Sequence, residues 1–452
     1  MSRAAILSVL ARSLLAGEPA YPAARSRAER TLGRRWRWLG PLARRFAGRF
    51  GDVVRPRHRD VVRFLARDAG FSEALHAYGG RIRIAEWLAE PQRMLPVEAA
   101  LAWDLPVIET AGALAEWLGV TVDELDWFAD RKDLCGRANA SEQLRHYRLR
   151  LLAKRTGGAR LTEAPKPRLK AVQRRILEGI LDRVPPHPAA HGFVQGRSIV
   201  TFAEPHARRR MLLRLDLADF FPASPAARVE ALFRTLGYPE AAAGLLAGLC
   251  TTATPRAFWR DCPAWLGAEE WSAARTLYAR PHLPQGAPTS PALANAMAYR
   301  LDCRLAGLAR SAGAVYTRYA DDLAFSGDLE FARGVHRFAA HAAAVALEEG
   351  FAVNHRKTRI RGQGARQRLA GLVVNDRPNL PRRDLERLEA ILVNCARRGP
   401  QGQNRAGEAD FRAHLEGRVG YVEMVNPAKG ERLRRILETI AWPERQGRTL
   451  DS

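Results

Sequence analysis

The sequence of 452 residues predicts an α+β fold preceded by a basic helical extension. Two apolar stretches, residues 211–217 and 314–326, have strand character and carry aspartates at a strand end or at a turn. Segments with the apolar spacing of helices separate such stretches, as in the one that contains Val335, Phe338 and Ala342. In this order of elements, acidic side chains at strand ends can converge on one site.

The composition excludes two classes of protein. Hydrophobic residues make up 47% of the chain, which excludes a largely disordered protein. No apolar run approaches the ~18 residues that a membrane-spanning helix needs, so an integral membrane protein is excluded as well. The five cysteines are odd in number and lack a C-x-x-C pair. They therefore favour reduced thiols in a cytoplasmic protein over a disulfide scaffold or a zinc site.

The charge of the chain favours a polyanionic partner. The 72 lysines and arginines, against 48 acidic residues, leave a net charge of +24. Codon bias explains the preference for arginine over lysine, but it does not explain the excess of positive charge. Such an excess is typical of nucleic-acid binding, because cations that neutralise phosphates release counterions. An anionic membrane surface is the alternative partner.

Residues 1–105 form the predicted basic, mostly helical extension. Residues 1–60 contain 14 arginines and four acidic residues, so 14 − 4 gives a local charge of +10. Between Arg34 and Trp38 the sequence RRWRW interleaves cations with indoles, a pattern suited to stacking on bases and contacting phosphates. The alternative is an amphipathic helix with solvated arginines and buried tryptophans. Both interpretations remain open from the sequence.

Three further segments precede the first apolar strand. Residues 111–128 have the spacing of a helix-turn-helix with Gly119 at the turn, which predicts either DNA recognition or two packed helices of another purpose. Residues 144–160 are basic and are predicted to be helical up to Gly157. The segment EAPKPRLKAVQRRILEGIL predicts a short extended piece that opens onto a helix after Pro167.

Three aspartates carry the chemical argument. Asp321 and Asp322 lie in TRYADDLAFSG, where a tight hairpin turn would direct both carboxylates into one cavity. Taken alone, they could equally form a solvated turn. Asp216 ends a second apolar strand in LRLDLADFF, a poor design for a surface. Three carboxylates from adjacent strands can hold two divalent ions ~4 Å apart, one activating a hydroxyl and the other neutralising a leaving pyrophosphate. Oxygen-only ligands favour Mg²⁺ or Mn²⁺ over zinc.

With these motifs the sequence resembles the reverse transcriptases, and among them the bacterial retron type. YADD at Tyr319–Asp322 matches the polymerase motif Y-x-D-D, and LDLADFF is similar to the strand that supplies the first catalytic aspartate. Five more segments follow the family's order: APKPRLKAVQRRIL, HGFVQGRSIVTFAEPH, LPQGAPTSPALANAMAYRLD, VNHRKTRI and HLEGRVGYVEMVNPAKGERL. The resemblance covers roughly residues 110–440 and implies a right-hand polymerase, with fingers and palm at 106–375 and a helical thumb at 376–452. The extension at 1–105 lies outside the resemblance.

Two segments depart from the retron pattern. The family's N-A-x-x-H is replaced by a segment that begins at Phe202 and keeps the histidine, His206, but not the asparagine. The family's V-T-G is replaced by Leu369-Ala370-Gly371. Both segments are associated with retron-specific handling of RNA, so the departures concern the subclass rather than polymerisation.

The resemblance also implies roles for individual residues. Asp216, Asp321 and Asp322 would be the catalytic, metal-binding acids, with the carbonyl of Leu217 as a further metal contact. Phe221 would exclude a ribose 2′-hydroxyl, with a core phenylalanine as the alternative. The other implied nucleotide contacts are Asp219, Phe220, Gln285, Gly286 and Lys357. The alternatives are a solvated acid for Asp219, a core ring for Phe220, a plain turn for Gln285 and Gly286, and a solvated lysine for Lys357. The implied template or RNA contacts are Arg160, Arg168, Lys170 and His206, where a basic face would look the same.

The implied reaction is RNA-templated DNA synthesis from dNTPs with two Mg²⁺ ions. A retron enzyme would use a structured noncoding RNA as primer and template, form a branched RNA–DNA product, and act in phage defence with an effector protein. Another bacterial reverse transcriptase, such as a group II intron or defence-associated enzyme, is the first alternative; no Cys/His endonuclease-like module follows the thumb, which disfavours the intron type. The second is a helix-turn-helix regulator or an inactive RNA-binding scaffold. The three acids argue against the scaffold.

Overall fold

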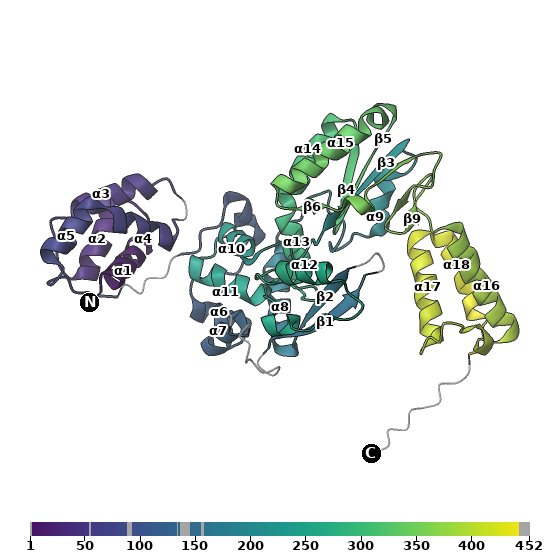
Figure 1. Cartoon of the computed structure of the whole chain (residues 1–452), viewed down its shortest axis with the longest axis horizontal. Helices are drawn as coiled ribbons and strands as arrows, with labels where there is room; N and C mark the ends of the chain where they lie inside the picture. Colours follow the sequence, from purple (N-terminus) through teal and green to yellow (C-terminus); the bar gives the residue numbers. More distant parts are fainter. Residues whose placement is uncertain are drawn as a thin grey trace, which may run out of the picture. The chain divides into compact units, whose positions relative to one another are not determined.

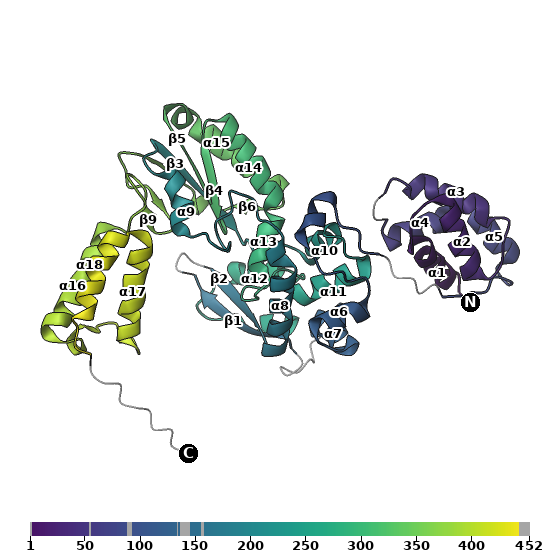
Figure 2. The same cartoon turned by 180° about the vertical axis from the view of Figure 1, so that it is seen from behind.

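The structure is a computed structural model, which describes residues 2–53, 56–87, 93–132, 134–135, 145–154 and 158–442 (Figures 1 and 2). The chain forms two compact units, one of Met1–Pro185 with Ser224–Leu293 and the other of Pro186–Ala223 with Ala294–Ser452. Helices and strands follow each other in the manner of the predicted α+β fold. None of the described helices combines the length with the apolar composition that a membrane span requires.

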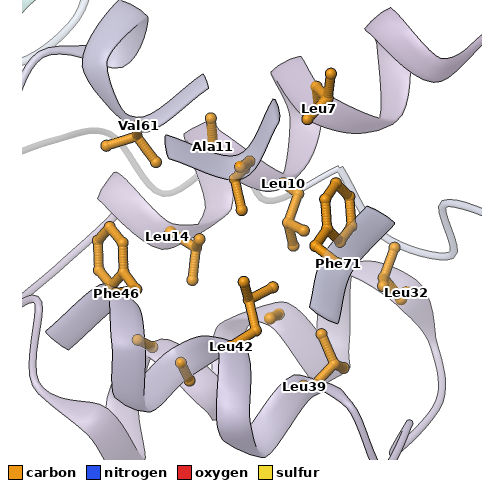
Figure 3. Packing of buried hydrophobic residues seen from close by; sticks show 14 of the residues in the cluster. Leu7, Leu10, Ala11, Leu14, Leu32, Leu39, Leu42, Phe46, Val61 and Phe71 are labelled. Carbon is orange, nitrogen blue, oxygen red and sulfur yellow. The ribbon is translucent and has the colours of Figure 1, made fainter. Parts of the chain in front are cut away.

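The first unit begins with a bundle of five helices that has its own core. The helices are α1 (Arg3–Leu15), α2 (Tyr21–Leu32), α3 (Leu39–Phe50), α4 (His58–Arg67) and α5 (Ala69–Tyr78). Their apolar faces meet around Leu10, Leu14, Leu42 and Phe46 (Figure 3). The same cluster of buried side chains extends to Ile82. The extension is therefore a packed helical bundle rather than a loose basic arm.

The tryptophans between Arg34 and Trp38 belong to this core. Trp36 is 9% exposed, and Trp38 packs against the same cluster. The guanidinium of Arg34 lies 4.6 Å from the centre of the Trp36 ring, while Arg35 and Arg37 are exposed to solvent. The prediction that these indoles stack on bases is therefore wrong, because rings packed in a core have no free face for a base. The burial of the tryptophans beside solvated arginines is confirmed, but the amphipathic helix of that alternative is wrong, because Arg34–Trp38 lie in the turn between α2 and α3.

The predicted helix pair at 111–128 is present as α6 (Ala111–Leu118) and α7 (Val122–Ala129). Gly119 ends α6 in the left-handed conformation, with φ 70°, and Thr121 caps α7. The first turn of α7 carries Asp123 and Glu124, and the helix has no basic residue. Because acidic side chains repel phosphates, this composition is the opposite of what a DNA-recognition helix needs. The pair instead packs on α11 (Glu240–Cys250).

The predicted helix at 144–160 is wrong. The described part of this segment belongs to an antiparallel hairpin of β1 (Tyr147–Ala153) and β2 (Ala159–Pro165). In β1, leucines at 149 and 151 alternate with arginines at 148 and 150, which is the period of a strand. The extended piece and the helix after Pro167 are confirmed as β2 and α8 (Pro167–Gly179). The unit also contains α10 (Ala226–Thr235), α12 (Ala268–Tyr278) and the 3-10 turns η1 (Glu98–Trp103), η3 (Leu181–Arg183) and η5 (Arg256–Trp259).

The second unit is built on an antiparallel sheet whose long strand is β3. The strands are β3 (Met211–Ala218), β4 (Val315–Tyr319), β5 (Asp322–Gly327), β6 (Ala352–Val353) and β7 (Arg359–Gly362). Their order is β4-β5-β3-β6, and β7 also pairs with β3. The strands predicted at 211–217 and within 314–326 are thus confirmed. The strand predicted near 351–360 is two short strands, separated by the 3-10 turn η6 (His355–Lys357).

Alternation of side chains gives the sheet two different faces. Phe325 packs on Phe338 of α15 (Leu329–Glu348), and α14 (Tyr299–Ser311) packs beside it (Figure 1). On the opposite face, Leu212 and Ala324 share a cluster with Phe202 of α9 (Ile199–Ala203). Asp216 and Asp322 belong to this second face, because each lies an even number of residues from Leu212 or Ala324.

The remaining elements complete the two units. α13 (Ser290–Met297) follows the loop at 283–289, in agreement with the predicted passage from a loop into a helix. The last three helices pack around a cluster of their own that includes Leu392, Leu415 and Leu433. They are α16 (Arg382–Arg398), α17 (Phe411–Val425) and α18 (Pro427–Glu438). The short elements η4 (Glu204–His206), β8 (Arg368–Leu369), β9 (Leu372–Val373) and η7 (Gln401–Gln403) connect the others.

Candidate active site

The candidate active site lies at one end of the sheet in the second unit. β4 and β5 form a hairpin in which Tyr319 pairs with Asp322, so that Ala320 and Asp321 make the turn. Ala320 adopts a left-handed backbone with φ 55°. Asp216 of β3 lies directly opposite Asp322 of the neighbouring strand β5. The strand register therefore brings together the three aspartates that the sequence singles out.

Burial and mutual repulsion raise the pKa values of these acids. The pKa of Asp321 is raised to about 6, first by desolvation and then by the negative charges of Asp322 and Asp216. Desolvation also raises the pKa of Asp322, although Arg214 opposes the shift. The amide of Leu217 donates to the carbonyl of Asp321 at 2.8 Å, which ties β3 to the turn. The site is a concentrated patch of negative charge in a partly dry environment.

Two cations hold two of the three carboxylates. Nζ of Lys357 lies 2.9 Å from both carboxylate oxygens of Asp216 and donates a hydrogen bond to Oδ2. Arg214 donates from Nη2 to both oxygens of Asp322, at 2.6 and 2.9 Å. Lys357 is predicted from the sequence, whereas Arg214 is not. The sequence does contain a signal for Arg214, because a residue two positions before Asp216 in a strand lies on the same face of the sheet.

The donor set fits a hard divalent cation. Oδ1 of Asp216 is buried and accepts no hydrogen bond, and carboxylate oxygens are the ligands that Mg²⁺ and Mn²⁺ prefer. Among the described residues, however, no three His, Cys, Asp or Glu side chains form a ready metal-ligand group. Lys357 and Arg214 lie on the carboxylates instead. Divalent ions would therefore compete with these two cations.

The residues after Asp216 divide into core and surface. Phe220 is buried against Phe351, and the Arg318 guanidinium lies 5.7 Å from the centre of its ring. This placement corrects the expectation that Phe220 contacts the nucleotide, because its ring is part of the core. Phe221 is half-buried beside the exposed ring of Phe193. Asp219 is exposed, with a left-handed backbone of φ 48°.

Gln285 and Gly286 lie in a loop of the first unit that is bound to β2. The carbonyl of Gln285 accepts the amide hydrogen of Glu163 at 2.8 Å. Gly286 has φ +133°, and a Cβ there would lie 3.0 Å from the Glu163 carbonyl oxygen, so the position requires glycine. Oε1 of Gln285 is buried and has no hydrogen-bond partner in the structure. The loop thus approaches the strand closely and carries an unsatisfied polar group.

A buried acid–histidine pair lies behind this loop. Glu163 and His282 are almost fully buried, and Oε2 of Glu163 lies 2.8 Å from Nε2 of His282. Nδ1 of His282 donates to the carbonyl of Arg280 at 2.7 Å, because a carbonyl can only accept. Thr254 donates to the other oxygen of Glu163 at 3.0 Å. The sequence does not predict this pair, since 119 residues separate the partners.

The four residues expected to contact template or RNA are placed differently. Arg160 and Lys170 are exposed, on β2 and α8. Arg168 is also exposed but donates to Glu124 of α7 at 2.5 Å. His206 is completely buried and hydrogen-bonded. This placement corrects the expectation that His206 contacts the template, because its ring is enclosed by the protein.

Comparison with known proteins adds an independent finding. Residues 152–369 match a family model described as reverse transcriptase (RNA-dependent DNA polymerase). The chain is 45% identical over 347 residues to the Retron Mx65 reverse transcriptase of Myxococcus xanthus, covering 76% of this chain and 74% of that protein. It is 37% identical over 362 residues to the Retron Mx162 reverse transcriptase of the same organism, covering 77% and 70%. With the Retron Ec86 reverse transcriptase of Escherichia coli, identity is 34% over 211 residues, covering 47% and 57%.

Proposed function

Because the chain belongs to the bacterial retron-type reverse transcriptases, and is therefore an RNA-directed DNA polymerase, we propose that Asp216, Asp321 and Asp322 form its catalytic centre. One observation carries this proposal: the pairing of β3 with β5 sets Asp216 opposite Asp322, with Asp321 in the adjoining turn. The α+β right-hand polymerase fold expected from the sequence is confirmed by the family match and by the mixed helices and sheet.

We assign two Mg²⁺ ions to these carboxylates, with Mn²⁺ as a substitute and the Leu217 carbonyl as a further oxygen ligand. When bound, such ions supply charge neutralisation at the attacking and leaving oxygens of phosphoryl transfer. The primer hydroxyl oxygen forms a bond to the α-phosphorus of a dNTP and passes its proton to solvent water. The bond from that phosphorus to the bridging oxygen breaks, and pyrophosphate leaves with the bonding electrons. Lys357, whose ammonium group contacts Asp216, is the proposed proton donor to pyrophosphate.

The nucleotide would be selected by residues near the acids and by the glycine loop. We propose that the half-buried ring of Phe221 excludes a ribose 2′-hydroxyl by steric contact. Asp219 would place its backbone near the triphosphate. Gln285 and Gly286 would form the surface against which the new base pair rests, because glycine permits a close approach of the backbone. The unsatisfied Oε1 of Gln285 supports a role in binding, since a ligand could supply the missing donor.

The proposed nucleic-acid partner is a structured noncoding RNA that acts as primer and template. The net charge of +24 supports a polyanionic partner, and the relatives carry the word retron in their names. We propose that synthesis begins on an RNA 2′-hydroxyl and gives a branched RNA–DNA product, with a role in phage defence beside an effector protein. Arg160, Arg168 and Lys170 are the proposed contacts to the RNA backbone.

Sequencing of the nucleic acid that co-purifies with the chain, expressed from its native locus, tests this function. We expect a discrete structured RNA joined covalently to DNA, and we expect Asp321→Asn to yield the RNA without the DNA. Asp376→Asn is the matched control, because it removes an exposed carboxylate bound only at the surface, to Arg208. Bound RNA without DNA in the unaltered protein would favour another type of reverse transcriptase. The absence of any specific nucleic acid would overturn the proposal.

A further inference from the structure

We propose that a buried clamp, formed by residues 189–192 together with Arg318, Asp302 and Asn295, sets the position of the Ala320–Asp322 turn. The proposal rests on the catalytic role assigned above to the aspartates. None of the clamp residues belongs to the acid cluster itself. They are positioning residues, which act on the reaction through the backbone of the turn.

Arg318 is the centre of the clamp. Its side chain is fully buried on the face of the sheet that packs on α14. It donates from Nε and Nη2 to the two carboxylate oxygens of Asp302, at 2.8 and 2.6 Å. Nη1 donates to the side-chain oxygen of Asn295 at 2.9 Å and to the carbonyl of Ala320 at 3.1 Å. The planar guanidinium therefore joins the helix α14, the helix α13 and the catalytic turn.

The segment 189–192 holds the free edge of β4. The amide of Arg318 donates to the carbonyl of Ala189, and the amide of His191 donates to the carbonyl of Arg318, both at 2.7 Å. Nδ2 of Asn295 donates to the carbonyl of Gly192 at 2.9 Å. The amide of Asn295 thus links Arg318 to this segment, since its oxygen accepts from the guanidinium while its nitrogen donates to the segment.

Gly192 brings the segment into direct contact with the turn. A Cβ at this position would lie 2.4 Å from the backbone nitrogen of Ala320 and 3.0 Å from the carbonyl carbon of Tyr319. Both neighbours are backbone atoms, so a side chain cannot rotate out of the way. Only glycine allows this approach. The backbone of the catalytic turn is therefore enclosed by Gly192 and held by Arg318.

The turn needs such support for two reasons. Ala320 has a left-handed backbone, φ 55°, which a residue with a Cβ adopts only when the surrounding structure enforces it. Asp321 and Asp322 are neighbours in the chain and lie beside Asp216, so their negative charges favour opening of the turn. A clamp on the backbone opposes both the strain and the repulsion without consuming a carboxylate oxygen.

Gly192→Ala tests the clamp, because it changes the packing against the turn without removing a charge or a hydrogen-bonding group. We expect kcat for dNTP addition to fall about 100-fold, since displacement of a catalytic group by about 1 Å has an effect of that size. KM for the dNTP and the affinity for RNA should change little, whereas the melting temperature should fall moderately, because the buried Cβ pushes the segment and the turn apart. Gly307→Ala and Gly334→Ala are the matched controls, because a Cβ at either position meets no atom within 4 Å.

Two further variants keep the test independent of folding. Ala320→Gly removes the backbone strain that a Cβ causes in the left-handed conformation. The double variant with Gly192→Ala should therefore regain part of the lost kcat. Asn295→Asp keeps the acceptor for Arg318 but loses the donor to the Gly192 carbonyl, and should lower kcat about tenfold. Recovery in the double variant would show that the defect lies in the turn, because a general loss of folding would not respond to Ala320→Gly.

The outcomes separate this proposal from the proposed function. If Asp321→Asn abolishes synthesis but Gly192→Ala and Asn295→Asp retain full kcat, the clamp is wrong and the catalytic assignment stands. If Gly192→Ala lowers the RNA affinity in parallel with kcat, the segment is only structural and the proposal is overturned. If Asp321→Asn itself retains synthesis, the catalytic assignment fails and the clamp fails with it.

Discussion

Asp321 combines a functional requirement with a cost in stability. Desolvation of its carboxylate, followed by the negative charges of Asp322 and Asp216, raises its pKa from 3.8 to about 6. Because the folded pKa lies above the unfolded one, ionisation of this acid opposes folding. The cost is complete above pH 6 and disappears as the pH falls towards 4. At pH 7 it amounts to about 3 kcal/mol without a bound cation.

We expect Asp321→Asn to abolish DNA synthesis and also to stabilise the metal-free protein. The amide has nearly the same volume but cannot carry the repelling charge. Urea unfolding in the absence of divalent ions measures the second effect, which should be larger at pH 7 than at pH 5. RNA affinity should stay close to that of the unaltered chain. Asp376→Asn serves as the control for loss of an exposed carboxylate. A loss of unfolding free energy in Asp321→Asn at pH 7 would contradict this interpretation.

His206 makes the opposite contribution to the pH dependence of stability. Its ring lies between the hydroxyls of Ser326 and Thr317, each 2.7 Å away. Burial, and to a lesser extent the charges of His191 and Arg209, lower its pKa from 6.5 to about 3. Since the folded pKa lies below the unfolded one, the part of the unfolding free energy that depends on a neutral His206 is fully present above pH 6.5. It is lost progressively as the pH falls from 6.5 towards 3.

His206→Gln should remove this pH dependence. Between pH 6.5 and pH 5 the unaltered protein should lose about 2 kcal/mol of unfolding free energy relative to the variant. Urea titrations of both proteins at several pH values give the difference directly. His336→Gln, at an exposed position of α15, should leave the pH dependence of the unfolding free energy unchanged. A difference between the two proteins that stays constant from pH 7 to pH 5 would show that His206 is not the titrating group.

At the scale of elements, the loop of Gln285 and Gly286 depends on its attachment to β2. The Gln285 carbonyl and the Gly286 backbone both lie against Glu163, whose side chain is held in turn by His282 and Thr254. The loop therefore has a rigid, hydrogen-bonded support. A change in the backbone of the loop should alter nucleotide binding more than it alters the fold.

Gly286→Ala should raise KM for the dNTP about tenfold with a smaller effect on RNA affinity. The new Cβ would meet the Glu163 carbonyl oxygen in a backbone conformation that alanine rarely adopts, so the loop has to move. Steady-state kinetics with one dNTP varied at a time measure this effect. Gly267→Ala is the control in the same unit, since its Cβ would make only ordinary contacts. An unchanged KM would exclude the loop from the nucleotide site.

The elements show which part of the site a sequence can predict. β3 and the β4–β5 hairpin are predictable because an apolar run that ends in an acid is unusual, and their pairing follows from the family motif. β1 is missed because its arginines suggest a solvated helix, although its leucines alternate with a period of two. The contacts of Asp216 with Lys357 and of Glu163 with His282 join residues more than 100 positions apart. No local pattern encodes such contacts.

At the scale of the whole molecule, the N-terminal bundle is a separately packed part of the first unit. Its core includes Val61, Leu65, Phe71 and Ile82, all beyond residue 60. Removal of residues 1–60 would therefore cut through the core and expose apolar surface. Substitution of exposed arginines is a cleaner test of its contact with RNA, because it leaves the packing intact.

Replacement of Arg34, Arg35 and Arg37 by glutamine should weaken RNA binding and reduce its dependence on salt. If all three contact phosphates of single-stranded RNA, the slope of log affinity against log salt should decrease by about two units. Filter binding between 50 and 200 mM salt measures the slope. Glutamine at Arg25 and Arg30 should have a smaller effect, because their ion pairs, at 2.7 and 2.9 Å, are shorter than the 3.8 Å contact of Arg35 with Glu29. An equal slope in all proteins would assign the bundle a role other than RNA contact.

The sequence predicts the order of the structural elements better than it predicts the role of each one. The apolar and acidic segments of the second unit are recognisable because catalysis and burial restrict their residues. The bundle lies outside the family match at 152–369, so its tryptophans have to be interpreted from a short local pattern. That pattern is ambiguous, since packing against Leu32 and Phe71 uses the same aromatic residues as stacking on a base.

The central position of β3 restricts how this enzyme can change over evolutionary time. β3 pairs with β5 along one edge and with β6 and β7 along the other, and it carries Asp216 near its end. Insertion or loss of a single residue would exchange the two faces of the strand and place a leucine where the carboxylate is needed. The strand can therefore accept substitutions of its buried side chains, but it cannot accept a change in its length. Descendants of this chain should differ in loops and terminal helices long before they differ in the number of residues between Met211 and Asp216.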